Sequence, residues 1–181
     1  MKIKSENLVI RSAIEGDAEH LAAWWNNGEV MAHAGFPHGL GISIEETRRL
    51  IARNEIERGQ RCILEVDGLR IGEMSYQIEN STAEIGIKVC EAHWQNQGLG
   101  TRFLRTLIAY LFGEENRNQD QPIEKIILDT NLNNSRAQHV YEKLGFNKVR
   151  VNEKAWQDQL GEWQSSVDYE LSRTAFRFTN L

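Results

Sequence analysis

A glycine-containing loop from His93 to Thr101 carries the strongest chemical pattern in the sequence. It joins an apolar, strand-like run to a long amphipathic helix pattern. Gly98 and Gly100 are separated by one residue, which lets the backbone pass close to a ligand. A helix that begins here would point its unpaired N–H groups and the positive end of its dipole at an anion. The loop therefore predicts a phosphate-binding site.

Single residues exclude the two common nucleotide-binding loops. A P-loop has a lysine directly after its last glycine, whereas Gly100 is followed by Thr101 and Arg102. A dinucleotide fingerprint has a third glycine where this chain has Phe103, whose ring would hold the helix and the strand apart. The remaining pattern is Gln95-x-x-Gly98-x-Gly100.

The elements at the N-terminal end are expected to form a strand and two helices. We expect a strand over Leu8–Arg11, and then a helix with Asp17 as its cap and Asn26–Gly28 as its end. Met31–Gly41 is rich in glycine and histidine and predicts an irregular loop that is long enough to line a pocket. Ser43–Glu46 is a capping box that opens the second helix. The apolar sides of the two helices consist of Ala18, Leu21, Ala22 and Trp25, and of Thr47, Leu50 and Ile51.

Three antiparallel strands are predicted to lead into the glycine loop. Arg61–Val66 and Leu69–Ile78 are joined by Asp67-Gly68, a strong signal for a two-residue hairpin turn. After a polar turn, Ala83–Val89 alternates between apolar and polar residues. Its polar face carries Glu84, Gly86 and Lys88.

The chain after the loop predicts an alternation of helices and strands. A regular apolar stripe from Leu99 to Leu111 indicates a helix that ends near Gly113, and residues 114–121 read as a solvated connection. The wholly apolar Ile126–Leu128 is typical of a strand that is buried on both faces. The remaining elements are a helix over Ala137–Leu144 closed by Gly145, and strands around Lys148–Ala155 and Ser166–Leu171 with a turn near Leu160-Gly161.

Composition and charge limit the classes of protein. The 181 residues, 40% of them hydrophobic and 26% charged, suit one folded domain over 1–181. A net charge of −5 argues against nucleic acid or a membrane surface as the main partner. Cys62 and Cys90 lack metal-ligand spacing and are expected to be buried thiols. Met1–Glu6 has no apolar signal region and no run approaches the length of a membrane span, so we expect a cytoplasmic protein.

Two segments resemble signatures of one family, the GCN5-related N-acetyltransferases (GNAT). Gln95–Gly100 resembles the acetyl-CoA pyrophosphate loop of that family. Asn134–Phe146 is similar to its later signature, in which an Asn precedes a Tyr by two helical turns. The two segments occur in order with a strand between them, and the resemblance covers nearly the whole chain. It extends to the RimJ/RimL-like branch, which includes acetyltransferases of ribosomal-protein N-termini, of spermidine and of some aminoglycosides.

The resemblance implies a fold and a reaction. The fold is α+β (α/β mixed), with a central mixed, mostly antiparallel sheet of about seven strands flanked by about four helices. The reaction is acyl transfer from acetyl-CoA, a cosubstrate, to a primary amine, without a metal. An alkylamine with a pKa of about 10 is protonated at neutral pH, so the enzyme has to remove a proton.

Glu84 and Tyr141 are the candidate catalytic residues. Glu84 lies on the polar face of the strand before the loop and is the candidate base, directly or through a water. Its alternative is a solvated or salt-bridged carboxylate. The resemblance makes Tyr141 the candidate acid for the CoA thiolate. The alternative for Tyr141 is an aromatic side chain that only packs on the buried face of its helix.

The resemblance also implies the residues that bind acetyl-CoA. Asn134 either reaches the pantetheine or caps its helix, and Arg102 and Arg136 either meet the ribose phosphate or lie on the surface, which we favour for Arg102. Compared with the usual pattern, one extra residue falls around Cys90–Ala92 and a proline near Ala92 is missing. A bulge in the strand would accommodate the extra residue. The backbone contacts assigned to Val89 and Cys90 could then shift by one residue. The predicted acetyl-CoA contacts are Val89, Cys90, Gln95, Asn96, Gln97, Gly98, Leu99, Gly100, Thr101, Asn134 and Arg136.

The acceptor side is less defined. By resemblance, the region of Trp25, His33 and Phe36 walls the acceptor site, and its aromatic rings would suit an organic cation. The alternative is a core role for Trp25 and no special role for the loop residues. Trp156 and Trp163 in the C-terminal hairpin reach either the same pocket or a partner in a dimer, and the chain is expected to be a monomer or a homodimer.

Three functions remain open at this point. The first is an N-acetyltransferase that acts on a ribosomal-protein-type N-terminal amine. The second is an acetyltransferase of a small amine, such as a polyamine or an aminoglycoside. The third, from a different class, is a non-catalytic CoA-binding regulatory module.

Overall fold

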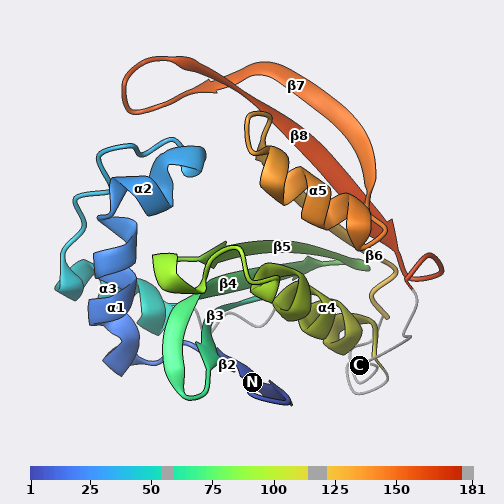
Figure 1. The fold of residues 1–181 in the computed structure, drawn as a ribbon, viewed down its shortest axis with the longest axis horizontal. Helices are drawn as coiled ribbons and strands as arrows, with labels where there is room; N and C mark the ends of the chain where they lie inside the picture. The colour runs from blue at the N-terminus through green and yellow to red at the C-terminus, as the bar shows by residue number, and fades with distance from the viewer. Residues whose placement is uncertain (54–58, 114–121, 177–181) are drawn as a thin grey trace.

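An eight-stranded sheet runs through the computed structural model, which describes residues 1–53, 59–113 and 122–176. Its strand order is β1-β2-β3-β4-β5-β6-β8-β7 (Figure 1). Every neighbouring pair is antiparallel except β5 and β6, which are parallel. The strands are β1 (Lys2–Ser5), β2 (Leu8–Ser12), β3 (Gly59–Val66), β4 (Leu69–Glu79), β5 (Thr82–Val89), β6 (Lys125–Asn131), β7 (Asn147–Gln157) and β8 (Trp163–Ser172).

Helices cover both faces of the sheet. Helices α4 and α5 pack on one face, and α1 and α3 pack on the other (Figure 1). This arrangement confirms the expected mixed, mostly antiparallel fold. The differences within the described residues are the short β1 and the one-turn α2, which the sequence reading did not include. The helices are α1 (Ala18–Trp25), α2 (Gly28–Met31), α3 (Ile44–Arg53), α4 (Leu99–Phe112) and α5 (Ser135–Lys143).

Two apolar cores hold the layers together. The larger lies between the sheet and α4, where Phe103, Leu104 and Leu107 are fully buried. The smaller lies under α1 and includes Cys90, while Cys62 belongs to the larger one. Both cysteines are free and buried, as predicted, and burial raises the pKa of both thiols.

Local turn and capping signals were predicted well. Asp67 and Gly68 both have positive φ angles, of 51° and 80°, as a tight hairpin turn requires. At the start of α3, the Ser43 hydroxyl accepts from the Glu46 N–H and the Glu46 carboxylate accepts from the Ser43 N–H. Leu50 was expected inside but is exposed, because α3 buries only its Thr47 and Ile51 side. The predicted connection over residues 114–121 lies outside the described residues.

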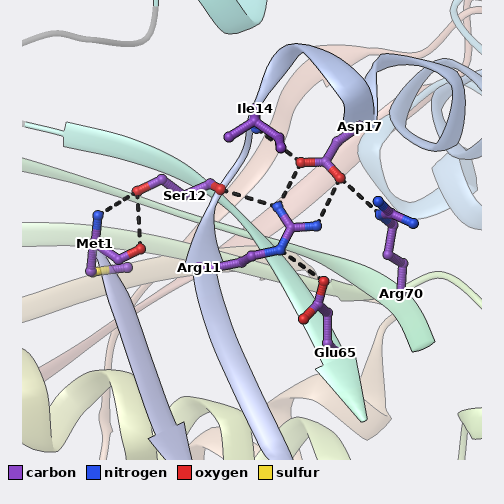
Figure 2. A network of polar contacts seen from close by, with 7 residues as sticks. All are labelled: Met1, Arg11, Ser12, Ile14, Asp17, Glu65 and Arg70. Carbon is purple, nitrogen blue, oxygen red and sulfur yellow. Dashed lines mark hydrogen bonds and ion pairs between the residues drawn. The ribbon is translucent and has the colours of Figure 1, made fainter. Parts of the chain in front are cut away.

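The prediction that Asp17 caps α1 is wrong. Asp17 directly precedes the helix, but its carboxylate makes no capping hydrogen bond. Instead it accepts two hydrogen bonds from Arg11, at 2.7 and 2.8 Å, one from Arg70 at 2.8 Å and one from the Ile14 N–H at 2.9 Å (Figure 2). Arg11 also pairs with Glu65 on β3. The fully buried carboxylate therefore joins β2, β4 and the start of α1.

This network predicts an acid-sensitive stability. Burial alone would raise the pKa of Asp17, but the hydrogen bonds from Arg11, Ile14 and Arg70 outweigh it and lower the pKa from 3.8 to about 2. Because the folded pKa is the lower one, this stabilisation is present above pH 3.8 and is lost as the pH falls toward 2. Urea unfolding of the wild type between pH 5 and pH 2 should show this loss. The Asp17→Asn variant should be less stable at pH 5 and have a shallower acid slope, and an unchanged slope would contradict the assignment.

No helix in the described ranges combines the length and the apolar character needed to cross a membrane.

Candidate active site

The parallel strands β5 and β6 part in the middle of the sheet. They pair only at Thr82–Lys125, Ala83–Ile126 and Glu84–Ile127. Both strands continue beyond this point, and no further pairing joins them in the described structure. The last pair includes Glu84, so the sheet opens beside that side chain. The part of β5 that does not pair with β6 is its C-terminal half, which leads to the glycine loop.

The glycine loop has the backbone geometry of an anion site. Gly98 is left-handed, with a φ of 73°, and directly precedes α4. A Cβ atom at Gly98 or Gly100 would meet no non-neighbouring atom within 4 Å, so the backbone is open to a ligand there. The first N–H groups of α4 have no intrahelical partner. Gln95 anchors the loop to β5, because its Nε2 donates to the Val89 carbonyl at 3.0 Å. These features fit a bound pyrophosphate.

The extra residue near Cys90 is accommodated after β5 and not inside it. The register between β4 and β5 is unbroken as far as Val89. The N–H groups of Cys90 and Glu91 then both donate to the Ile71 carbonyl, at 2.8 and 3.1 Å. Two successive residues therefore face one residue of β4 directly after β5, which is the hydrogen-bond pattern of the expected β-bulge. The Cys90 N–H is thus already bonded within the sheet and is not available to acetyl-CoA.

Helix α5 connects to the loop through its first turn. The Asn134 side chain accepts from the Ala137 N–H at 3.2 Å, which confirms the capping alternative. Arg136 donates to the Asn96 side chain at 2.9 Å and so joins α5 to the glycine loop. Arg102 instead pairs with Glu6 at 2.7 Å, which agrees with the surface role that we favoured.

The cap predicts a modest stability effect that can be separated from ligand binding. The Asn134→Ala variant should lose about 1 kcal/mol of unfolding free energy, because the Ala137 N–H loses its partner. Asn134→Ser keeps a capping oxygen and should restore most of that loss. Chemical unfolding measures both values. If Asn134→Ser were as unstable as Asn134→Ala, the side chain would have a different structural role, and acetyl-CoA titration of both variants tests the pantetheine alternative.

Tyr141 is a buried aromatic whose phenol remains protonated at neutral pH. Its ring packs edge-on to Tyr169, with centroids 5.6 Å apart, and lies 6.1 Å from the ring of Phe146. Burial, followed by the charge of Asp129, raises the pKa of Tyr141 to about 12. Tyr141 therefore packs on the buried face of its helix, as the alternative from the sequence predicted. This packing is compatible with a role as proton donor, because the donor form is the protonated one.

A polar pocket of about 350 Å³ lies over the opening, on the face opposite α4 and α5. Glu84 and Asp129 stand on its two parted strands, and Arg61 contributes a positive charge from β3. A second pocket of about 260 Å³ shares Glu84 and also includes Glu79. The predicted base thus lines a cavity that suits an amine. The other residues of the larger pocket are Gly59, Gln60, Ser75, Tyr76, Gln77, Ile85 and Gly86.

Asp129 was missed by the sequence reasoning. It follows the apolar run Ile126–Leu128 near the carboxyl end of a parallel strand, which is a common place for functional side chains. That run was expected to be buried on both faces. In the structure Ile127 is only half-buried and lines the second pocket, because β5 pairs with β6 over so few residues.

Trp25 contacts the pocket residue Arg61 from the core of the protein. Its indole Nε1 donates to Glu73 at 2.9 Å, and the Arg61 guanidinium stacks on its ring at 4.8 Å. Glu73 also pairs with Arg61 and with Lys88. Burial alone would raise the pKa of Glu73, but the charges of Lys88 and Arg61 outweigh it, so the pKa is lowered and the carboxylate stays ionised. Trp25 is a core residue that orients Arg61, and it does not itself line the pocket.

The C-terminal hairpin docks on the loop of residues 31–41 in the same chain. Gln159 bonds to the backbone of Gly35, His38 and Gly39, at 2.9 to 3.0 Å. A Cβ atom at Gly35 would lie 2.3 Å from the Trp156 ring, so only glycine allows this approach. Figure 1 shows the tip of β7 and β8 arching toward α2.

The other residues predicted for the acceptor site lie on the hairpin and on the loop of residues 31–41. Of the two alternatives for the hairpin, Trp156 contacts the loop of residues 31–41 in its own chain, whereas Trp163 is 57% exposed. His33 and Phe36 are exposed on that loop, outside the lining of the larger pocket. Their part in substrate binding stays a prediction.

Comparison with known proteins identifies the class. Residues 7–147 match the acetyltransferase (GNAT) domain family. The chain therefore belongs to the GNAT family of acetyltransferases, which use acetyl-CoA as the acetyl donor, as the two signatures predicted. In the described residues, no group of three or more His, Cys, Asp or Glu side chains is arranged to hold a metal ion.

Solved structures with the same fold include two kinds of acetyltransferase. The chain is similar to RimL, a ribosomal L7/L12 alpha-N-protein acetyltransferase in complex with coenzyme A (19% identity, TM-score 0.81, 95% of this chain and 98% of that one). A Salmonella typhimurium enzyme that modifies the N-terminal serine of L7/L12 has a TM-score of 0.78 (19% identity, 95% and 99% covered). A spermidine N-acetyltransferase from Vibrio cholerae, with CoA and spermine, has a TM-score of 0.80 (20% identity, 94% and 98% covered). A search of curated protein sequences finds no significant match.

Proposed function

We propose that this protein transfers the acetyl group of acetyl-CoA to the α-amine of a peptide N-terminus. The observation that carries the proposal is the charge pattern of the larger pocket, where Arg61 lies on one strand and Glu84 and Asp129 lie on the two strands that part. A peptide N-terminus has an ammonium group next to a carbonyl oxygen. Carboxylates bind the first and a guanidinium binds the second.

Arg61 retains hydrogen-bonding capacity for such an acceptor. Of its five donors, only one Nη1 hydrogen bond, to Glu73, joins it to another described side chain. Its Nε is buried without a partner in the described structure. The contacts to Glu73 and the Trp25 ring hold the guanidinium in place beside the pocket. A fixed guanidinium suits recognition of a carbonyl better than a flexible lysine would.

The donor side of the proposal rests on the residues around the parted strands. The open backbone at Gly98 and Gly100 would hold the pyrophosphate, and the Arg136–Asn96 contact would keep α5 next to the loop. Glu84 lies where the strands part and would attract the ammonium. Tyr141 would give its phenol proton to the thiolate that leaves.

A small amine is the second candidate acceptor. The smaller pocket extends the site past Glu84 to Glu79, so a second ammonium group could be bound there. A spermidine acetyltransferase shares the fold. A non-catalytic CoA-binding module is the third candidate, and the retained pocket and Tyr141 argue against it.

Thiol release from acetyl-CoA separates the three candidates. The panel consists of peptides with free N-termini, the same peptides with blocked N-termini, polyamines and aminoglycosides. We expect release with the free peptides and none above background with the blocked ones. Preference for a polyamine or an aminoglycoside would replace the peptide assignment. Acetyl-CoA binding without release for any amine would support the non-catalytic module.

Arg61 provides a prediction specific to the peptide acceptor. The Arg61→Lys variant keeps a cation beside Glu73 but loses the planar array of donors. Its KM for a peptide should rise about 10-fold, because a charged hydrogen bond is lost or weakened. Its KM for acetyl-CoA should stay unchanged. Steady-state kinetics with both substrates varied measures this, and an unchanged peptide KM would remove Arg61 from the acceptor site.

A further inference from the structure

We propose that Asp129 is the group that takes the proton from the acceptor amine, while Glu84 holds the ammonium in place. This inference rests on the proposed function. It assigns different tasks to the two carboxylates that line the larger pocket.

Asp129 lies on the part of β6 that no longer pairs with β5. It lies on β6 two residues beyond Ile127, the last residue that pairs with β5. Asp129 lines the same pocket as Glu84. No hydrogen bond from another described residue engages the Asp129 carboxylate, so its oxygens are available to a ligand.

The charges around Asp129 favour proton uptake. Asp168 stands directly opposite on β8, where Arg150 and Asn152 bind its carboxylate at 2.9 and 2.8 Å. From the other side of the pocket, Glu84 on β5 and Arg61 on β3 face the same space. Partial desolvation and the charge of Asp168 raise the pKa of Asp129. A carboxylate with a raised pKa is a stronger base and is closer to the working pH.

Asp129 is also close enough to the proposed acid to affect it. Its negative charge contributes to the raised pKa of Tyr141, whose ring lies on the α5 side of the opening. The proton acceptor and the proton donor would then face the reacting atoms from the two sides of the parted strands. A general base has to reach the nitrogen that loses a proton, and a general acid has to reach the sulfur that gains one.

In the proposed step, two protons leave the nitrogen and one proton reaches the sulfur. The Asp129 carboxylate takes one proton from the ammonium and later releases it to water. The freed nitrogen lone pair forms the amide C–N bond as the thioester C–S bond breaks, and a second nitrogen proton passes to water in the pocket. Tyr141 gives its proton to the departing thiolate and regains one from water. The sum is an acetylated amine, a free thiol and one proton released.

Asp129→Asn tests the assignment, because the amide keeps the shape of the carboxylate but cannot take up the proton. We expect kcat/KM for the best acceptor of the panel to fall about 10²- to 10⁴-fold, with an unchanged KM for acetyl-CoA. Glu84→Gln should mainly raise the acceptor KM and keep the acid limb of the pH profile. Asp168→Asn should remain active and move that limb to lower pH, because it removes the charge that raises the pKa of Asp129.

The outcomes distinguish this inference from the proposed function. If the wild type acetylates an amine but Asp129→Asn keeps its kcat/KM and its pH profile, only the role of Asp129 is overturned. If Glu84→Gln loses kcat and the acid limb while Asp129→Asn keeps both, Glu84 is the base. If the wild type acetylates no amine, the proposed function fails, and this inference fails with it.

Discussion

The Tyr141→Phe variant should bind acetyl-CoA with nearly wild-type affinity and lose about 10²- to 10⁴-fold of kcat. The substitution removes only the phenol oxygen from a side chain that is 7% exposed and packed against Tyr169 and Phe146. The apolar ring contacts therefore remain, and the fold should be kept. What is lost is the proton for the departing thiolate. Acetyl-CoA titration and steady-state kinetics measure the two quantities separately.

Tyr169→Phe is the matched control for this variant. Tyr169 is also buried and contacts the Tyr141 ring, but its hydroxyl donates to Glu142 at 3.0 Å and has no part in the proposed chemistry. The same chemical change should cost this variant one hydrogen bond, about 1 kcal/mol of stability, and little activity. Equal losses of kcat in both variants would show a packing effect. Full activity in Tyr141→Phe would remove Tyr141 as the acid.

The Gly98→Val variant should bind acetyl-CoA roughly 10- to 100-fold more weakly, as expected when one charged hydrogen bond to the pyrophosphate is lost. The left-handed φ of 73° is strained for a branched side chain, so the loop backbone would shift. The valine would also occupy space that is open beside the backbone. Isothermal titration with acetyl-CoA measures the change.

Gly68→Val separates backbone strain from ligand binding. Gly68 has a similar φ of 80° and equally open surroundings, but it lies in the turn between β3 and β4. Both variants should lose stability, and only Gly98→Val should lose acetyl-CoA affinity. Unchanged affinity in Gly98→Val would contradict the assignment of the loop.

The features that the sequence predicted correctly depend on residues that are close along the chain. The Asp67-Gly68 turn, the Ser43–Glu46 capping box and the apolar stripe of α4 each extend over one or a few turns of backbone. Asp17 does not cap α1 because its carboxylate binds Arg11 and Arg70 instead. Arg70 lies far from Asp17 along the chain. Such long-range partners leave no local pattern.

The same limit applies to the site. The glycine loop and the Asn134-to-Phe146 segment were recognisable because each is contiguous, and the family match agrees with them. Asp129 was not recognisable, because its access to a pocket depends on where β5 and β6 part. Trp25 looked like a wall of the acceptor site, but it lies under Arg61 through a contact with Glu73 that only the folded sheet creates.

Mass spectrometry of a peptide product locates the acetyl group and so tests whether the protein acetylates the N-terminal amine. The acceptor peptide has both a free α-amine and a lysine side chain, and it is incubated with acetyl-CoA and the wild-type protein. We predict a single acetyl group on the N-terminal nitrogen. Acetylation of the lysine alone, or an unmodified peptide under conditions where a polyamine is acetylated, would contradict the proposal.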